Sequence, residues 1–168
     1  RAVYIRTGKQ NLVWGRTYFW NPTDLINLEK RSFTDLNRQR EGTFGTKIHL
    51  PFGSSENIYA FLNYQNATGL QTIPLALKYE VLLGNVEVGV STLIRQSYQP
   101  MLGMDAATAL WGYDVSGELR LTAGDIRDQL SGDSITTYRR SNVWIPKLSL
   151  GASRSFSFDI PDRFQLTT

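Results

Sequence analysis

Few side chains in this sequence of 168 residues could carry out catalysis. The single histidine, His49, is close to Ser54 and Ser55, and hydrolases use such residues as base and nucleophile. The sequence lacks the G-x-S-x-G turn that exposes a nucleophilic serine, and His49 falls on the polar face of a predicted strand. Glu80 and Glu87 could act as an acid–base pair, but charges that face a wet interior are the simpler interpretation. We therefore predict no catalytic residue and no enzyme activity.

Metal and cofactor chemistry is not indicated by the sequence either. There is no cysteine, no metal-ligand spacing and no P-loop. Several aspartates fail to match a calcium-binding loop, namely Asp105, Asp114, Asp125, Asp128 and Asp133. The net charge of +3 is too small by itself to indicate nucleic acid binding. We predict no cofactor, no metal site and no nucleic acid partner.

Apolar and polar residues alternate over long stretches, which predicts β-strands with one apolar face. In residues 44–52, apolar side chains fall on one face, and Lys47 and His49 fall on the other. Residues 73–95 repeat the pattern on both sides of a Gly-Asn dipeptide at 84–85, which is typical of a two-residue hairpin turn. The hairpin predicts four cross-strand pairs: Leu83 with Val86, Val81 with Val88, Tyr79 with Val90, and Leu75 with Ile94.

Nine segments are predicted as strands on this basis: 2–15, 43–52, 57–65, 73–83, 86–95, 102–110, 114–123, 143–153 and 163–168. Both faces of the third segment are partly apolar, so its direction is not assigned. Short turns near 53–56, 84–85, 111–113 and 161–162 alternate with longer links at 16–42, 66–72, 96–101 and 124–142. Short connections on one side and long ones on the other are typical of outer-membrane barrels.

Two further properties favour a membrane barrel over a soluble sandwich or lectin-like sheet. Many predicted strands are about ten residues long, which suits a tilted strand that crosses a membrane. Aromatic residues such as Phe52, Trp111 and Trp144 lie near predicted strand ends, as in interfacial girdles. Mean hydropathy, −0.28, does not separate the two classes, because a polar interior offsets an apolar outer face. We expect an all-β, antiparallel, up-and-down transmembrane β-barrel.

Two stretches resemble a known family. Residues 8–15 read G-K-Q-N-L-V-W-G and residues 21–25 read N-P-T-D-L. This combination resembles porin-like outer-membrane β-barrels of Gram-negative bacteria, including uncharacterised families and relatives of the alginate-export type. The resemblance covers only this part of the chain and transfers no catalytic residue. It implies a location in the bacterial outer membrane and a pore-like role, with outer-membrane lipid and lipopolysaccharide as partners.

The second of these stretches also predicts a local structure. Asn21 is a good helix N-cap, Pro22 suits the first helical position, and Asp24 provides an acid in the first turn. Leu25 and Ile26 begin an apolar stripe. We therefore expect a short helix in the first long loop, and either it constricts the mouth of the barrel or it packs on neighbouring loops.

Charged and polar positions on the inward faces predict the lining of a pore. This set consists of Lys47, His49, Lys78, Glu80, Glu87, Arg95, Asp114, Glu118 and Arg120, and the same faces include Asp105 and Lys147. A mixed lining suits a polar path without strong charge preference. A separate basic cluster lies in the long loops at Lys30, Arg31, Arg38, Arg40, Arg139 and Arg140. That cluster is interpreted either as a solvated or lipopolysaccharide-facing surface or as a funnel for anionic solutes.

These observations predict an outer-membrane pore or transport barrel for small polar solutes. They leave open which solute passes and what the oligomeric state is. Two alternatives are a non-conducting barrel that displays loops for adhesion or partner binding, and a soluble antiparallel β-sheet binding domain. The first and last predicted strands are cut by the ends of the sequence, and bacterial barrels use even strand numbers. We therefore expect residues 1–168 to be one barrel segment, incomplete at both ends, of a larger barrel with about 12–18 strands.

Overall fold

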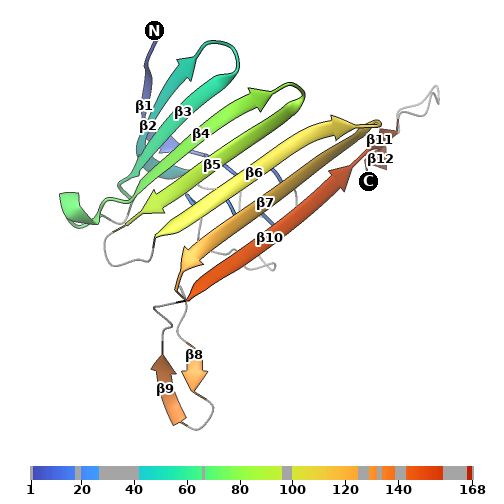
Figure 1. Cartoon of the computed structure of the whole chain (residues 1–168). Coiled ribbons are helices and arrows are strands. Elements are labelled where there is room, and N and C mark those ends of the chain that lie inside the picture. The colour runs from blue at the N-terminus through green and yellow to red at the C-terminus, as the bar shows by residue number, and fades with distance from the viewer. Residues whose placement is uncertain are drawn as a thin grey trace.

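Eight strands form one antiparallel sheet in which neighbours in space are neighbours along the chain (Figure 1). The computed structural model describes residues 2–17, 20–26, 42–65, 67–95, 100–124, 129–131, 134–138, 143–156 and 166–167. The strands of the sheet are β1 (Tyr4–Gln10), β2 (Thr43–Phe52), β3 (Glu56–Asn63), β4 (Leu75–Leu83), β5 (Val86–Ile94), β6 (Met101–Leu110), β7 (Tyr113–Ala123) and β10 (Trp144–Ser153). Outside the sheet lie a 3₁₀ turn, η1 (Leu70–Thr72), and two small hairpins: β8 (Gln129–Ser131) with β9 (Ser134–Tyr138), and β11 (Ser155–Phe156) with β12 (Leu166–Thr167).

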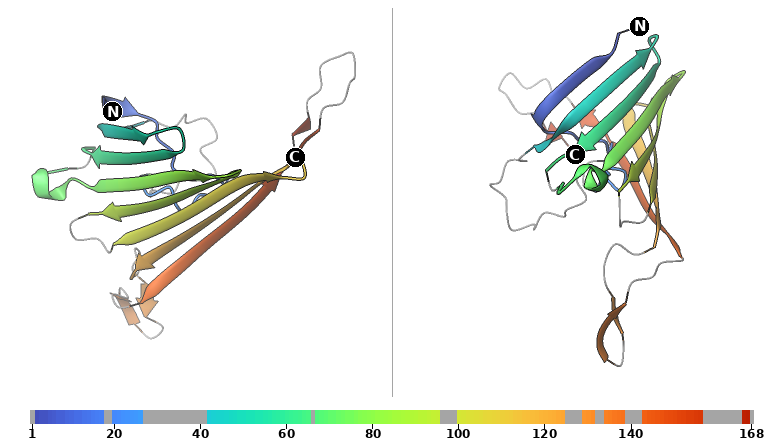
Figure 2. Two further views of the ribbon diagram at one scale, coloured as in Figure 1. Left: turned by 45° about the horizontal axis from the view of Figure 1, so that its top comes forward. Right: turned by 90° about the vertical axis from the view of Figure 1, so that its left-hand side faces the viewer.

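This architecture confirms the all-β, antiparallel, up-and-down prediction, and the sheet is open. Among the described residues, β1 pairs with β2 alone and β10 pairs with β7 alone. The last predicted strand, 163–168, does not join the sheet within its described part, because β12 pairs with β11. The sheet is curved, and the chain that follows β1 crosses its concave face (Figure 2).

Short turns lie at one end of the sheet and longer links at the other, as the sequence predicts. The short turns occupy residues 53–55, 84–85 and 111–112. Gly84 has a φ of +63°, a left-handed conformation that glycine adopts without a steric penalty. All four predicted pairs of the hairpin are present: Leu83 with Val86, Val81 with Val88, Tyr79 with Val90, and Leu75 with Ile94. The fourth predicted turn, near 161–162, lies outside the described residues.

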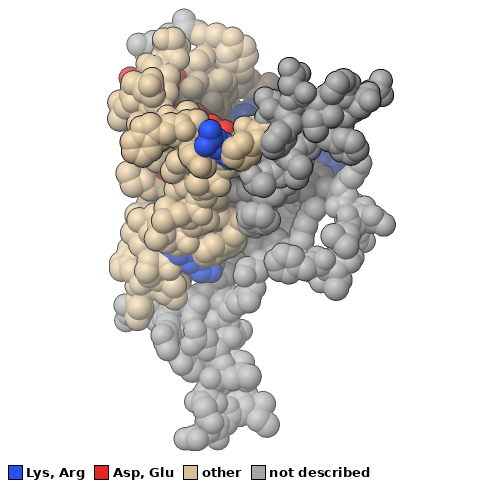
Figure 3. Space-filling model, turned by 90° about the vertical axis from the view of Figure 1, so that its right-hand side faces the viewer, with Lys and Arg blue, Asp and Glu red and all other residues tan. Residues whose placement is uncertain are grey.

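The two faces of the sheet have opposite chemistry. The concave face carries charged side chains that are nearly inaccessible, such as Asp105 and Glu118, each 1 % exposed. The convex face carries large apolar side chains that are accessible, such as Leu148 at 59 % and Leu150 at 76 %. From the side drawn in Figure 3, the described surface is mostly uncharged, and the few acidic and basic side chains lie in separate places on it. The sheet therefore hides charge and exposes apolar surface, which is the reverse of a soluble sheet with one face in water.

The pairing also assigns the direction of β3, which the sequence left open. Tyr59 lies opposite Lys78 and His49, and Phe61 lies opposite Ala76. Directly opposed residues share a face, so both rings point to the concave side. Phe61 is 1 % exposed there.

Two predictions about the first loop are wrong. The strand predicted at 2–15 ends at Gln10, whose partner Thr43 is the first residue of β2, so no strand is available to continue the pairing. The chain then turns onto the concave face. The helix predicted to begin at Asn21 is absent from residues 20–26, which form a turn in which the Asp24 N–H donates to the Asn21 carbonyl at 3.2 Å. Residues 27–41, the rest of that loop, lie outside the described residues.

A small apolar core lies between the concave face and the chain that crosses it. Its buried members are Trp14 and Leu25 from the crossing chain and Phe61, Ala76, Leu93 and Met101 from the sheet. Burial of the larger of these side chains stabilises each by roughly 1.5–3 kcal/mol relative to exposure. Residues 11–17 and 20–26 are therefore packed on the sheet through Trp14 and Leu25.

Replacing the turn glycine should destabilise the sheet through the backbone alone. A Cβ added at Gly84 meets no atom within 4 Å, so Gly84→Ala should cost only the left-handed strain of about 1–2 kcal/mol in the free energy of unfolding. Gly69→Ala is the matched control, because its Cβ is equally free and its φ of −173° is ordinary extended backbone. Denaturant unfolding measures both, and an equal loss in the two variants would contradict the turn assignment.

Candidate functional site

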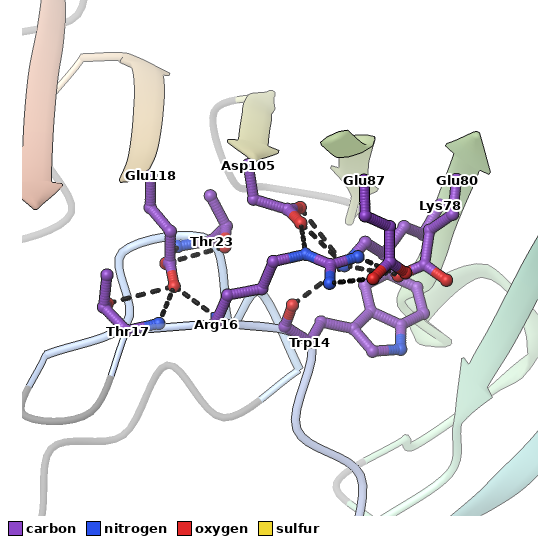
Figure 4. Close-up of polar contacts among 9 residues, drawn as sticks. All are labelled: Trp14, Arg16, Thr17, Thr23, Lys78, Glu80, Glu87, Asp105 and Glu118. Carbon is purple, nitrogen blue, oxygen red and sulfur yellow. Dashed lines mark hydrogen bonds and ion pairs between the residues drawn. The ribbon is translucent and has the colours of Figure 1, made fainter. Parts of the chain in front are cut away.

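The chain segment that crosses the concave face is the centre of the candidate site. We call residues 11–17 and 20–26 the inner segment. It runs beneath β4, β5, β6 and β7, whose charged side chains point down to it (Figure 4). The contacts join residues separated by 64 to 102 positions in the sequence.

Glu118 on β7 fixes one half of the inner segment by accepting hydrogen bonds from its backbone. One carboxylate oxygen accepts from the N–H of Thr17 at 2.7 Å and also from the N–H of Arg16. The other accepts from the N–H and the hydroxyl of Thr23 at 3.0 and 2.7 Å. Hydrogen bonds to an ionised carboxylate are stronger than neutral ones, and here they satisfy backbone groups that the fold withdraws from water. Glu118 therefore positions Arg16 and Thr17 as well as the turn that contains Thr23.

Arg16 joins the inner segment to three neighbouring strands. Its Nη2 lies 3.1 Å from a Glu80 oxygen on β4, its Nη1 lies 2.8 Å from a Glu87 oxygen on β5, and its Nε donates to Asp105 on β6. We call Glu80, Glu87 and Asp105 the acidic row, since adjacent strands place them side by side (Figure 4). A guanidinium presents its donors in a rigid plane, so one side chain binds all three carboxylates.

Lys78 is the second cation of this network and is buried on β4. Its Nζ lies 2.9 Å from Glu80, 3.1 Å from Asp105 and 2.9 Å from the carbonyl oxygen of Trp14. Two cations thus face the three carboxylates of the acidic row, which leaves one negative charge in excess. Buried charges persist in proteins when they are paired and hydrogen bonded in this way.

The environment of Arg16 keeps its guanidinium protonated. Burial alone would lower the pKa of Arg16, but hydrogen bonds and Coulombic attraction from Glu87 and Asp105 outweigh burial and raise the pKa above its usual range. Arg16 is therefore a permanent cation within the acidic row at any physiological pH.

A polar cavity of about 240 Å³ lies beside the acidic row. It is lined by Val13, Trp14, Gly15, Arg16, Lys47, Tyr59, Lys78 and Glu80. The Lys47 ammonium lies 4.9 Å from the centre of the Tyr59 ring at its wall, a cation–π distance. The cavity combines cations, a carboxylate and two aromatic rings, which suits a small polar guest.

The residues predicted to line a pore lie on the concave face, but the structure brings only some of them together. Lys78, Glu80, Glu87 and Glu118 contact the inner segment, as does Asp105. Of the others, Lys47 lines the cavity, His49 lies on β2, Arg95 follows the end of β5, Asp114 lies near the start of β7, and Arg120 is buried on β7. The predicted loop cluster, Lys30, Arg31, Arg38, Arg40, Arg139 and Arg140, lies outside the described residues. The role of these residues in a pore stays a prediction.

His49 is engaged in contacts of its own on β2. Its Nε2 lies 2.8 Å from the Asn57 side-chain oxygen, and its ring stacks on Tyr59 with centroids 4.5 Å apart. Ser54 and Ser55 lie in the turn that follows the strand. The structure thus shows an imidazole held by an amide and an aromatic ring.

Sequence reasoning missed Arg16, Thr17 and Thr23 as members of the site. The sequence places Arg16 and Thr17 where a predicted strand meets a loop, a position at which a cation is expected to be solvated. One signal was available: Gly15 and Asn21 belong to the two stretches on which the family resemblance rests, and they touch in the structure. A Cβ added at Gly15 would overlap the Asn21 side chain, so the two stretches require close approach of the chain on both sides of Arg16.

Comparisons with known proteins add no functional assignment. No protein-family model, no curated protein and no solved structure matches the chain. In the part of the chain that the structure describes, no helix has the length and apolar character needed to cross a membrane. The same residues include no group of three or more His, Cys, Asp or Glu that could hold a metal ion. The resemblance to porin-like barrels stays a prediction, and function is inferred from the geometry of the chain itself.

Neutralising Glu118 should loosen the inner segment. Glu118→Gln replaces one accepting oxygen by an NH₂ group that faces N–H donors, so we expect a loss of about 1–3 kcal/mol in the free energy of unfolding. Amide hydrogen exchange at Thr17 and Thr23 should become faster. Asp114→Asn is the matched control, because Asp114 lies on the same strand and face but is exposed. If the amides of Thr17 and Thr23 exchange at the same rate in both variants, the role of Glu118 is wrong.

Proposed function

We propose that this chain forms the wall of an outer-membrane barrel that passes small polar solutes along its charged concave face. The observation that supports this proposal is the reversed chemistry of the sheet. Charged side chains are buried on the concave face, whereas the convex face exposes large apolar side chains in every strand from β4 to β10 that belongs to the sheet. Lipid is the environment in which an apolar outer face is stable, and water inside a barrel is the environment that suits a charged inner face.

Strand length and edge geometry agree with this proposal. Apart from β1, the strands of the sheet are 8 to 11 residues long, and about 9–11 residues are needed for a tilted strand to cross a membrane. The sheet ends in two edge strands, β1 and β10. An edge cannot face lipid, because each unpaired backbone group would cost several kcal/mol. The proposal therefore includes further strands, from a longer chain or another subunit, that close the barrel between these edges.

A polar path rather than a strongly charged one fits the inner wall. Lys47, Lys78 and Arg120 alternate with Glu80, Glu87 and Glu118 over neighbouring strands. The polar cavity beside the acidic row has room for a small guest. Small polar solutes that hydrogen bond to both acceptors and donors are the class that such a wall suits.

One observation favours a second candidate, a barrel that does not conduct and displays its loops to a partner. The inner segment covers the concave face of four strands and is fixed by Glu118 and by the acidic row. A barrel filled in this way conducts only if the segment leaves space beside it or moves. Electrical measurements separate the two candidates.

The orientation of the two faces predicts different costs for two neighbouring substitutions. Ala106 and Ala107 lie in the middle of β6 on the convex and concave faces, paired with Val88 and Glu87 respectively. In lipid vesicles Ala106→Arg should cost roughly 2–4 kcal/mol in folding free energy. Ala107→Arg should cost much less, since its guanidinium meets water and Glu87. Equal costs in vesicles, or a mild effect of Ala106→Arg, would favour the soluble binding domain instead.

The same pair of substitutions tests the path itself. The full-length protein in planar lipid bilayers should give discrete conductance steps. Ala107→Arg should reduce the size of these steps because its side chain enters the path, whereas molecules of Ala106→Arg that do insert should conduct as the unsubstituted protein does. Insertion without any conductance would reject the pore in favour of the loop-displaying barrel.

A further inference from the structure

The guanidinium of Arg16 occupies the acidic row in the manner of a ligand. Each of its nitrogens contacts a carboxylate from a different strand: Nη2 with Glu80, Nη1 with Glu87 and Nε with Asp105. Glu80 and Asp105 both lie opposite Gly89 of β5, and Glu87 lies two residues from Gly89 on the same face, so the three carboxylates converge on one area of the sheet. Arg16 does not belong to the sheet; it reaches the row from the inner segment (Figure 4).

The sheet itself holds the acidic row in place. Lys78 binds Glu80 and Asp105 from within β4. Gly89 on β5 leaves the room that the Asp105 carboxylate needs, because a Cβ there would lie 2.6 Å from a carboxylate oxygen. The Asp105 side chain is fully shielded from solvent. The row is therefore arranged by sheet residues, and Arg16 fills the position that they leave.

We propose that the acidic row is a binding subsite for guanidinium-bearing cations, and that Arg16 occupies it as a ligand tethered to the chain. The subsite lies on the wall of the proposed path, so its part in transport rests on the proposed function. Its binding chemistry rests only on the contacts of Arg16. When Arg16 leaves, the row has three carboxylates against the single ammonium of Lys78.

A guanidinium suits this position better than an ammonium. A planar guanidinium directs donors along several edges and can contact three carboxylates at once, whereas an ammonium is a compact point charge. Lys78 already takes the ammonium position, with its Nζ between Glu80 and Asp105. The remaining contacts, which include Glu87, run along the row and match a planar cation.

Because Arg16 is tethered to the chain, it binds the acidic row in preference to a free ligand. A group held on the same chain has a local concentration in the millimolar range or above. Glu118 increases this advantage because it fixes the backbone of Arg16 and Thr17. Solute binding and displacement of Arg16 would therefore compete for the same carboxylates.

Removing Arg16 and adding a free guanidinium tests the proposal. Arg16→Ala, in the full-length protein in detergent or vesicles, is titrated with methylguanidinium chloride at millimolar concentrations, and its thermal midpoint is measured. Methylguanidinium at about ten times its Kd should raise the midpoint by about 4 °C. Methylammonium at equal ionic strength should have little effect on Arg16→Ala, and methylguanidinium should have little effect on the unsubstituted protein. Arg16→Ala combined with Glu87→Gln should lose most of the response.

A second readout keeps the test decisive if Arg16→Ala does not fold. Methylguanidinium should then increase the yield of folded Arg16→Ala during refolding, while methylammonium should not. The proposal is overturned if neither the midpoint nor the yield responds, or if both cations act equally, because Arg16 would then be only a structural ion-pair partner. Conductance separates this result from the proposed function: absence of conductance in every variant rejects transport, whereas the midpoint decides the subsite independently.

Discussion

The network of Arg16, Lys78 and the buried carboxylates is the constraint on which the rest of the structure depends. A carboxylate as inaccessible as that of Asp105 is tolerated only with charged partners and hydrogen bonds, because desolvation of an isolated ion is far too costly. The sheet supplies Lys78, and the inner segment supplies Arg16. The path of the chain after β1 follows from this requirement, since the segment must cross the concave face to bring Arg16 to three strands.

The fold was largely predictable because period-two alternation is a local signal. Each strand from β2 to β10 in the sheet lies within a few residues of its predicted bounds, and the Gly84-Asn85 turn fixed the register of its hairpin. Alternation also placed Lys78, Glu80 and Glu118 on one face. A strand that slipped by one residue would place these charges on the apolar side, so the pattern allows one register only.

The site was less predictable because its contacts are distant in sequence. Arg16 meets Glu80 across 64 residues and Asp105 across 89, and no local pattern connects them. The end of β1 at Gln10 was hard to predict for the same reason. The alternation continues toward Trp14, but a strand also needs a partner strand, and β2 begins only at Thr43. The expected helix at Asn21 is absent because the chain turns more tightly there. The Leu25 N–H donates to the Thr23 carbonyl at 2.8 Å, two residues back, whereas an α-helix needs an acceptor four residues back.

The two proposals depend on the same carboxylates in different ways. If the concave face is a path for solutes, the acidic row is its most negative part once Arg16 is displaced, and Arg16 is the cation that neutralises it when the inner segment is in place. Closure of the path by the inner segment and binding of a solute would then be a single equilibrium, in which Arg16 and the free cation compete for the acidic row. Such an equilibrium responds to a ligand only through the difference in its affinity for the two states. A neutral solute that does not bind the row would leave the inner segment where it is, whereas a guanidinium-bearing solute would shift the balance toward an open path.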